Sequence, residues 1–316
     1  MRARLPKIAP RTYSRIATIA FVSLVAIVLS GAAVRLTGSG LGCPTWPDCN
    51  GRFITTELDY HASVEYGNRL ITGFVGIAVI AAALMAFLRR PYRKDLFLLS
   101  LALPAGVIGQ IVLGALVVEY ELPPELVMQH FLLSQLILAA AFALMWRARR
   151  IEDDSNPSEP RNTVLATRAI VPLTAWILLL GTITTGAGPH PGTNGDQVAR
   201  RFVFRGGDTL DWMIHWHGRF STFFGLCAVA LWVYLRRQQA SARLRRAVTV
   251  LCLLVAAQGV VGFVQYETEL PAGMVWVHIT LATLTWISVL WAVAAAGKLA
   301  PAADTAGEPR PARTPA

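Results

Sequence analysis

Residues 109–130, GQIVLGALVVEYELPPELVMQH, align with residues 257–278, AQGVVGFVQYETELPAGMVWVH, without an insertion or a deletion. Each segment holds the end of one apolar stretch, a short polar loop and the start of the next apolar stretch. Similarity at a fixed spacing is typical of a chain built from repeated units, so we expect two units of one architecture. The matched residues stand 148 positions apart and include Gln110 and Gln258, Gly114 and Gly262, Leu122-Pro123 and Leu270-Pro271, and His130 and His278.

The rest of the chain is rich in apolar stretches. Of its 316 residues, 54% are hydrophobic and 15% are charged, against about 25% charged in soluble domains. A bilayer core is crossed by about 20 apolar residues in a helix. We therefore predict an all-α integral membrane protein with eight transmembrane helices, the first a retained span and not a cleaved signal peptide. The spans cover residues 16–34, 70–88, 96–118, 126–146, 169–187, 212–235, 247–266 and 274–296.

The basic residues alternate between crowded and sparse segments. Of the 29 Lys and Arg residues, 22 lie at the N-terminus, in every second loop and in the C-terminal tail. Membrane proteins concentrate such residues on the cytoplasmic side, so both termini are predicted to be cytoplasmic. The net charge of +10 then reflects topology, and we expect no nucleic-acid partner.

Four spans in each unit give both units the same orientation. We expect two pseudo-symmetric, parallel four-helix bundles related by an axis along the membrane normal, with room for a site in each bundle core. The predicted parts are an N-terminal bundle over residues 1–150, a cytoplasmic linker over 151–168, a C-terminal bundle over 169–298 and a disordered cytoplasmic tail over 299–316.

Two of the four cysteines lie in the first loop that is predicted to face outward. Cys43 and Cys49 belong to the segment GSGLGCPTWPDCNG, residues 38–51. An oxidising environment outside the membrane allows a disulfide there. Cys227 and Cys252 fall within spans, where we expect ordinary apolar packing.

None of the six histidines lies in a predicted cytoplasmic loop. In the second unit, His278 and one of His215 or His217 begin alternate helices at similar depth. Two neutral imidazoles facing each other across a bundle core suit a six-coordinate haem iron, whereas zinc takes a third and usually a fourth ligand. Ionisable residues within membrane spans indicate function, so we predict a haem site here. His190, in the third outer loop, is predicted to be structural.

The first unit is not a copy of the second. Where the second unit reads MIHWHGR, the first reads EYGNR, so a haem there has His130 on one face and a weak or open position at Asn68. Open positions favour chemistry or substrate exchange, and saturated positions favour electron transfer. The pattern therefore indicates a reactive first half and an electron-carrying second half.

Three charged residues near these positions have two interpretations each. Glu65 is either a carboxylate that a helix N-terminus favours or a catalytic group. Arg69 and Arg219 occupy similar places in the two units. They either neutralise haem propionates or extend to the lipid headgroups.

With these residues in view, the chain resembles the haem A synthase family, bacterial and mitochondrial enzymes that convert haem O to haem A. The resemblance covers roughly residues 15–296. It is most specific in RLTGSGLGCPTWPDC, in VEYGNRLITG and in the two repeated span–loop–histidine segments. It implies oxidation of the methyl group on ring D of haem O, through successive hydroxylations, to a formyl group.

The resemblance also assigns roles to residues. It places the substrate haem O in the first half and a b-type haem in the second. Glu65 matches the catalytic glutamate and His130 the retained first-half histidine. His278 matches one member of the second-half pair, and the other is His217 or His215, of which we prefer His217 because it leads directly into Gly218-Arg219 as Asn68 precedes Arg69. A haem O synthase is the implied source of haem O and membrane lipid surrounds the protein. The electron acceptor and the oligomeric state are not indicated.

The outer loops both match the family and depart from it. Cys43 and Cys49 match the first-loop cysteines, either as a structural staple or as a redox pair. Many members carry a histidine where this chain has Asn68. Some members carry a second cysteine pair in the third outer loop, and residues 187–211 of this chain hold none.

Two other functions are compatible with eight spans. A di-haem b-type cytochrome would pass electrons without modifying haem, and we expect its two saturated haems at different depths. All candidate ligands here lie near the outer face of the cell membrane, which argues against electron transfer across the membrane between two haems. A transporter or haem chaperone should have broken helices and a site near the midplane. We favour the synthase over both.

Overall fold

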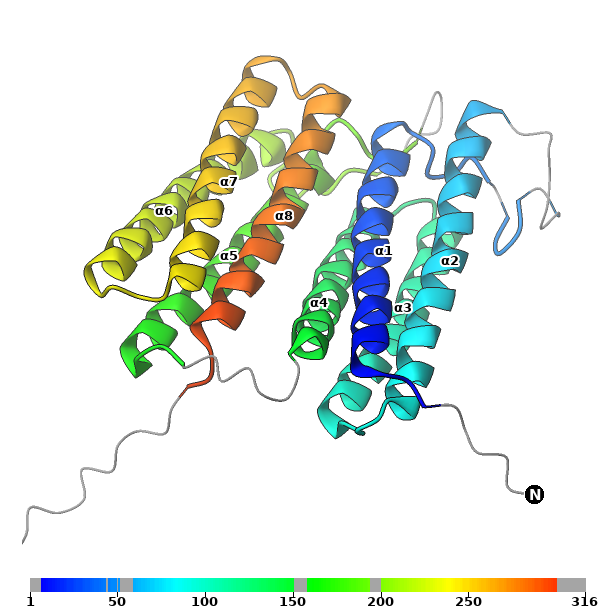
Figure 1. The fold of residues 1–316 in the computed structure, drawn as a ribbon. Coiled ribbons are helices and arrows are strands. Elements are labelled where there is room, and N and C mark those ends of the chain that lie inside the picture. The colour runs from blue at the N-terminus through cyan, green and yellow to red at the C-terminus, as the bar shows by residue number, and fades with distance from the viewer. Residues whose placement is uncertain are drawn as a thin grey trace, which may run out of the picture.

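A computed structural model of the chain describes residues 7–43, 45–49, 51, 59–150, 158–193 and 200–299. The described residues form eight α-helices and contain no named β-strand (Figure 1). All eight helices are long and apolar enough to cross a membrane, as the sequence predicts. The helices are α1 (Pro10–Leu36), α2 (Tyr60–Leu88), α3 (Lys94–Glu119), α4 (Pro124–Arg149), α5 (Arg161–Ala187), α6 (Thr209–Arg237), α7 (Ala242–Glu267) and α8 (Ala272–Ala296).

Several helices extend well beyond the predicted apolar spans. Helix α2 begins at Tyr60, ten residues before the predicted span, because the Asp59 side chain accepts a hydrogen bond from the Ala62 amide at 2.7 Å and caps the helix. The roughly three turns between this cap and the apolar stretch carry Glu65 and Asn68. Helix α5 likewise begins at Arg161, before the span predicted from residue 169. Residues 151–157 of the predicted linker and 300–316 of the predicted tail lie outside the described residues.

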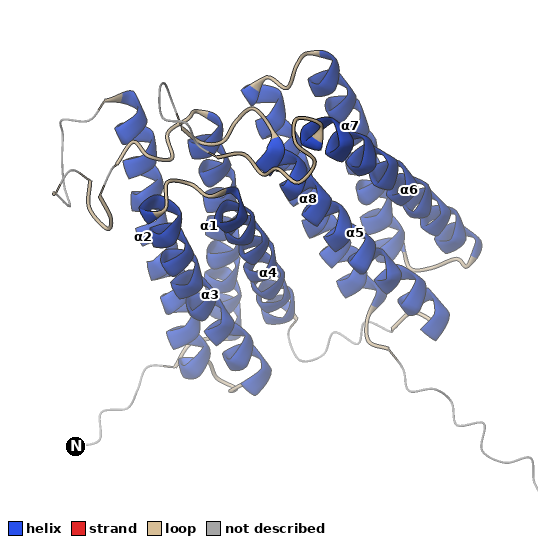
Figure 2. Ribbon diagram, turned by 180° about the vertical axis from the view of Figure 1, so that it is seen from behind, coloured by secondary structure: helices blue, strands red, loops and turns tan. Residues whose placement is uncertain are grey.

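The helices form two groups that lie side by side. Helices α1–α4 pack together in one group and α5–α8 in the other (Figures 1 and 2). Contacts of α1 with α8, and of α4 with α5 and α8, join the groups. One of these contacts is the hydrogen bond from Trp286 Nε1 on α8 to the carbonyl oxygen of Gln135 on α4, at 3.0 Å.

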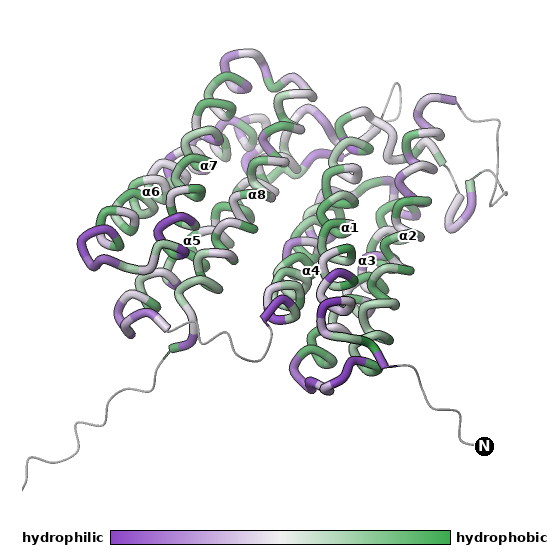
Figure 3. The backbone as a smooth tube through the Cα atoms, viewed as in Figure 1, coloured by the Kyte–Doolittle hydropathy of each residue, from purple (hydrophilic) through white to green (hydrophobic). Residues whose placement is uncertain are grey.

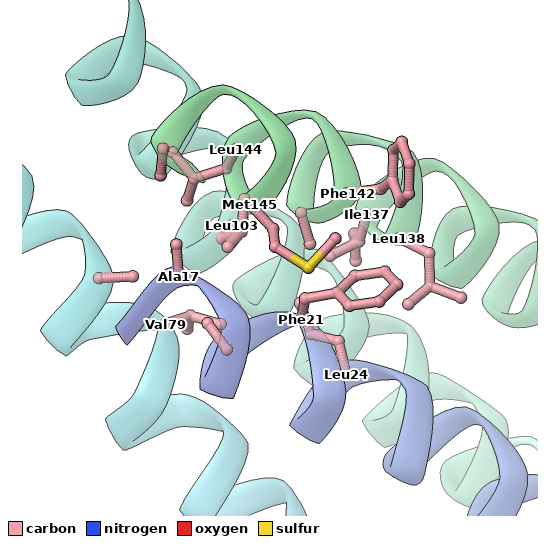
Figure 4. Close-up of a cluster of buried hydrophobic side chains, with 14 of the residues drawn as sticks. Ala17, Phe21, Leu24, Val79, Leu103, Ile137, Leu138, Phe142, Leu144 and Met145 are labelled. Atoms are coloured by element: carbon pink, nitrogen blue, oxygen red, sulfur yellow. The ribbon is translucent and has the colours of Figure 1, made fainter. Parts of the chain in front are cut away.

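Each group has its own apolar core. In the first group, Phe21 of α1 packs edge-on against Phe142 of α4, with ring centres 5.9 Å apart, among the buried side chains of Figure 4. In the second group, Phe224 of α6 and Leu251 of α7 belong to a separate buried cluster. Because the helices interlock through such side chains, the residues on their facing surfaces are held in fixed positions.

The outer surface of both groups is apolar. Figure 3 shows hydrophobic residues along the middle of the helices and hydrophilic residues at the turns. Large exposed side chains include Ile77 on α2, Leu136 on α4, Leu226 on α6 and Leu253 on α7. A water-soluble monomer rarely exposes so much contiguous apolar surface. The chain is a multi-pass membrane protein.

Four helix connections lie on one side of the molecule, which we call the cysteine side because it carries Cys43 and Cys49. They join α1 to α2, α3 to α4, α5 to α6 and α7 to α8. The opposite side, the linker side, carries the other three connections, and α1 begins and α8 ends there. Pro104 lies within α3 and Pro172 within α5, and neither interrupts its helix. The broken helices expected of a transporter are therefore not seen in the described spans.

The two repeated sequence segments have the same backbone conformation. Glu121 and Leu122 have φ of 57° and 60°, and Glu269 and Leu270 have φ of 62° and 60°. The Leu122 amide donates to the Val117 carbonyl at 2.8 Å, and the Leu270 amide donates to the Gln265 carbonyl at 2.7 Å. Two consecutive left-handed residues end α3 and α7 in the same way, and a proline then precedes α4 and α8.

Candidate haem sites and the disulfide loop

Two histidine rings face each other within the second group of helices. His217 on α6 and His278 on α8 have ring centres 6.2 Å apart, with their planes inclined at 68°. A glycine lies against each ring. A Cβ atom added at Gly181 of α5 would stand 3.2 Å from His217 Cε1, and one at Gly262 of α7 would stand 3.3 Å from His278 Cε1. The two glycines thus leave the space that the imidazoles occupy.

The separation of the two rings fits two histidine ligands of one iron. Metal–imidazole nitrogen distances are about 2 Å, which places the centres of two opposed ligand rings about 6 Å apart. His217 Nδ1 is buried and has no hydrogen-bond partner among the described residues. No group of three or more His, Cys, Asp or Glu side chains within the described ranges could hold a metal ion. A haem therefore fits this pair better than zinc does.

The structure separates the two histidines that the sequence left as alternatives. His215 lies on the outside of α6, where its Nδ1 is 2.8 Å from the Asp211 carbonyl oxygen. Half of its side chain is exposed. Only His217 of the two is brought next to His278, because residues two positions apart on an α-helix point about 200° apart.

The first group holds a single histidine at the corresponding depth. His130 and His278 are each the seventh residue of their helix, α4 and α8. A Cβ atom at Gly114 of α3 would be 3.6 Å from His130 Cε1. His130 Nδ1 is buried without a hydrogen-bond partner in the described structure. Gln110 of α3 donates to the His130 carbonyl oxygen at 2.9 Å.

Asn68 takes the helix position that His217 has in the second group. Helices α2 and α6 are both 29 residues long, and Asn68 and His217 are each the ninth residue. Asn68 Oδ1 accepts a hydrogen bond from Ser30 of α1 at 2.7 Å. Ser30 is as far from the start of α1 as Gly181 is from the start of α5. One group thus has a polar Ser–Asn pair where the other has a glycine beside a histidine.

Glu65 is buried beneath the loop that carries the cysteines. Its side chain accepts the Cys43 amide proton at Oε2, at 2.7 Å, and forms an ion pair with Arg69 through Oε1, at 2.5 Å. Glu65 is 5% exposed, and both of its oxygens have a donor. The carboxylate is therefore held in one orientation between α2 and the loop.

Arg69 binds the loop as well as Glu65. Its guanidinium donates to the carbonyl oxygens of Thr45, Asp48 and Cys43. The predicted disulfide between Cys43 and Cys49 is confirmed, and both cysteines are fully buried. Arg69 thus fixes the short disulfide loop on α2, a contact that the sequence analysis did not foresee.

The two arginines that the sequence pairs have different surroundings. Arg219 lies 5.1 Å from the centre of the Trp216 ring and is exposed, whereas Arg69 is engaged with Glu65 and the loop. Cys227 and Cys252 are free and half-buried.

Further polar contacts join the loops of the cysteine side. Arg35, at the end of α1, donates to the carbonyl oxygens of Thr185 and His190, at 2.8 and 3.0 Å. His190 Nε2 lies 2.7 Å from the Leu270 carbonyl oxygen, a structural contact of the kind the sequence predicts. These bonds link the first helix group to the third loop, and the third loop to the α7–α8 connection. Sequence reasoning missed Arg35 because an arginine at a span end has no characteristic pattern.

Comparisons with known proteins place the chain beside one family. The family model COX15-CtaA, described as cytochrome oxidase assembly protein, matches residues 14–190, which is more than half of the chain. The chain is similar to a protein named Heme A synthase from Lysinibacillus sphaericus, with 33% identity over 129 residues, 40% of this chain and 42% of that relative.

Other relatives with the same printed name match to a similar extent. One from Alkalihalophilus pseudofirmus is 34% identical over 124 residues, 39% of this chain and 42% of that relative. One from Bacillus mycoides is 29% identical over 130 residues, 41% of this chain and 42% of that relative. The matched segments span about two fifths of the length of these curated relatives.

Proposed function

Because the chain belongs to the COX15-CtaA family of cytochrome oxidase assembly proteins, we propose that it is a membrane-embedded haem A synthase. The proposed reaction oxidises the ring D methyl group of haem O to a formyl group through successive hydroxylations. The observation that carries the proposal is the contrast between the helix groups. One has two facing imidazoles at 6.2 Å, and the other has one histidine, one asparagine and a buried carboxylate.

The two helix groups are proposed to be pseudo-symmetric, parallel four-helix bundles. Residues 1–150 form the substrate bundle, and residues 169–298 form the electron-carrying bundle together with the start of α5 from Arg161. The rest of the predicted linker, residues 151–160, and residues 299–316 are a cytoplasmic linker and tail. The repeated left-handed residue pairs at the ends of α3 and α7 support this proposal. So do the equal lengths of α1 and α5, at 27 residues, and of α2 and α6, at 29 residues.

The proposed orientation puts both termini in the cytoplasm and the cysteine side outside the cell membrane. Basic residues such as Arg147, Arg149, Arg236 and Arg237 end their helices on the linker side, as the positive-inside rule expects of a cytoplasmic face. The disulfide suits an oxidising exterior. The histidines of both bundles then lie toward the outer leaflet.

A resident haem b is proposed in the second bundle. His217 and His278 would hold it, and its chemistry there is reversible one-electron transfer. Gly181 and Gly262 leave room for the two imidazoles, and exposed Arg219 is the candidate partner of the propionates.

The first bundle is proposed to bind haem O as substrate. His130 offers the single imidazole, and Asn68, already bonded to Ser30, leaves the opposite face open for chemistry. Net oxidation of a methyl carbon to a formyl carbon removes four electrons as well as protons. The electrons are proposed to leave through the haem b of the second bundle to an electron acceptor outside the chain, and the Glu65 carboxylate is proposed to accept the protons one at a time. Arg69 orients that carboxylate and fixes the disulfide loop above it. A haem O synthase would supply the substrate.

The test is the haem content of the protein produced with a haem O-forming partner. Pyridine-haemochrome spectra of the extracted haem should show haem B together with haem O or haem A. Haem A establishes the activity. Haem B alone, with a confirmed supply of haem O, would overturn the synthase proposal and favour the electron-passing cytochrome.

A further inference from the structure

The repeated segments carry a glutamine that the proposed chemistry does not use. Gln110 of α3 and Gln258 of α7 each stand four residues before the glycine that faces a histidine ring, Gly114 or Gly262. Residues four apart lie on the same face of a helix. Each glutamine therefore points at the neighbouring helix that carries His130 or His278.

In the first helix group the glutamine is held by the backbone and a hydroxyl. Gln110 Nε2 donates to the His130 carbonyl oxygen at 2.9 Å and to Ser134 Oγ at 2.8 Å. Ser134 in turn donates to the same carbonyl at 3.0 Å. The His130 ring gains nothing from this network, since its Nδ1 has no hydrogen-bond partner in the described structure.

In the second helix group the hydroxyl is missing and the glutamine reaches the ring. The residue 148 positions after Ser134 is Ala282. The Gln258 amide can be oriented so that its nitrogen faces acceptors and its oxygen faces a donor. In this orientation Nε2 lies 3.1 Å from the His278 carbonyl oxygen and 3.2 Å from His278 Nδ1. Its oxygen then accepts the Ala282 amide proton at 3.1 Å. The alanine thus leaves the glutamine free to contact Nδ1.

We propose that Gln258 is a positioning residue for the haem ligand His278, and that the residue at 134 or 282 selects which histidine receives such support. The inference rests on the proposed function, because it assumes a resident haem on His278. Hydrogen bonds to the second nitrogen of a metal-bound imidazole fix its orientation and raise its basicity. A ligand bound through Nε2 carries its proton on Nδ1. For an iron-bound His278 the Gln258 oxygen, not its nitrogen, must therefore face Nδ1 and accept this proton. The amide then gives up its bonds with the His278 carbonyl oxygen and the Ala282 amide, and the bond to Nδ1 alone supports the ring.

The consequence is that the histidine ligands of the two bundles differ in how firmly they bind iron. A supported imidazole at His278 binds iron more firmly and favours the oxidised iron of a permanent electron carrier. An unsupported imidazole at His130 binds more weakly, which suits a haem that must leave as product. Ser134 withholds Gln110 from the His130 ring and so maintains the difference.

The experiment compares the reduction potential of the haem b in purified wild-type protein with that of three variants. Gln258→Leu removes the hydrogen bond to His278 Nδ1. Ala282→Ser keeps Gln258 but gives its amide a hydroxyl to bind in place of the His278 ring. Both should raise the potential and speed loss of haem b to an apo-globin acceptor, by about tenfold for Gln258→Leu. Gln110→Leu, the matched change in the other bundle, should leave the haem b potential unchanged.

Each outcome decides the proposal. If Ala282→Ser and Gln258→Leu retain the wild-type potential and rate of haem loss, Gln258 does not support the ligand. A shift of equal size in Gln110→Leu would also overturn the inference, because the effect would then be a general one. Should Gln258→Leu fail to fold, Ala282→Ser alone decides. Wild-type protein without haem b would instead contradict the proposed function, so the two failures are distinguishable.

Discussion

The two helix groups share a backbone plan and differ at a few side chains close to their histidines. The second group has His217 beside Gly181 and a ring partner at His278. The first has Asn68 bonded to Ser30 at the equivalent helix positions. A single glycine-to-serine difference and a single histidine-to-asparagine difference therefore separate a pair of adjacent imidazoles from a Ser–Asn hydrogen bond.

The two helix groups also differ in how their first connection on the cysteine side is held. The α1–α2 connection is bound to α2 through Glu65 and Arg69. In the second group the α5–α6 connection is instead bound by Arg35 and by the contact of His190 with the Leu270 carbonyl. Among the described residues of these connections and their partners, the buried carboxylate is that of Glu65 in the first arrangement. The comparison teaches that a repeated scaffold supplies position, whereas non-repeated side chains supply chemistry.

The largest expected effect is the loss of haem b when one ligand is removed. His217→Ala should abolish the b-type spectrum of the purified protein. Outer partners of a metal ligand are worth about 10- to 100-fold in affinity, and the ligand itself is worth more. His215→Ala is the matched control two residues away and should retain the spectrum, since His215 faces outward. The measurement is the reduced-minus-oxidised absorbance spectrum per mole of protein. Equal spectra in the two variants would break the assignment of the saturated pair.

Much of the helix plan was predictable from the sequence, for a physical reason. A bilayer requires about 20 apolar residues in every span, so hydropathy alone locates the eight helices. It does not locate their ends, because capped polar turns such as Tyr60–Asn68 are helical without being apolar. The sequence also pointed to candidate residues, since histidines at span ends are costly and the repeat aligns them, and their roles stay predictions.

The contacts of those residues were not predictable. Ser30 lies in an apolar span, and only tertiary packing brings it to Asn68. Arg69 binds three loop carbonyls, whose positions depend on how the chain closes around the disulfide. The choice between His215 and His217 depends on which face of α6 turns inward. Hydropathy does not decide this choice, because both faces of that helix carry apolar residues.

A smaller effect should sharpen the chemical side of the comparison. Glu65→Gln keeps the shape of the side chain but removes the proton acceptor and the ion pair with Arg69. Haem A formation should fall about 100-fold, the low end of the range for a catalytic acid–base group, while the haem b spectrum of the second bundle stays at its wild-type level. The measurement is the ratio of haem A to haem B extracted from cells that supply haem O. Glu267→Gln, at the exposed end of α7, is the control. Unchanged haem A in Glu65→Gln would remove Glu65 from the catalytic site.

The smallest effect compares two glycines at repeated positions. In Gly262→Ala the new Cβ atom would stand 3.3 Å from His278 Cε1 and 3.7 Å from Nδ1. The ring must then shift by a few tenths of an ångström, away from its place opposite His217. In Gly114→Ala the corresponding distance to His130 Cε1 is 3.6 Å, an ordinary contact, and alanine in a helix gains up to about 1 kcal/mol over glycine.

The two alanine variants should therefore change in opposite directions. Gly262→Ala should lose haem b several-fold faster to an acceptor protein, because its ligand ring is displaced, and this is about 1 kcal/mol of binding. Gly114→Ala should keep its haem b and resist thermal unfolding in detergent at least as well as the wild type. Faster haem b loss in Gly114→Ala, or none in Gly262→Ala, would mean that the glycines do not set the space around the two histidines. The difference between the helix groups would then rest on other residues such as Asn68 and Glu65, and the close fit around His278 would follow from helix packing alone.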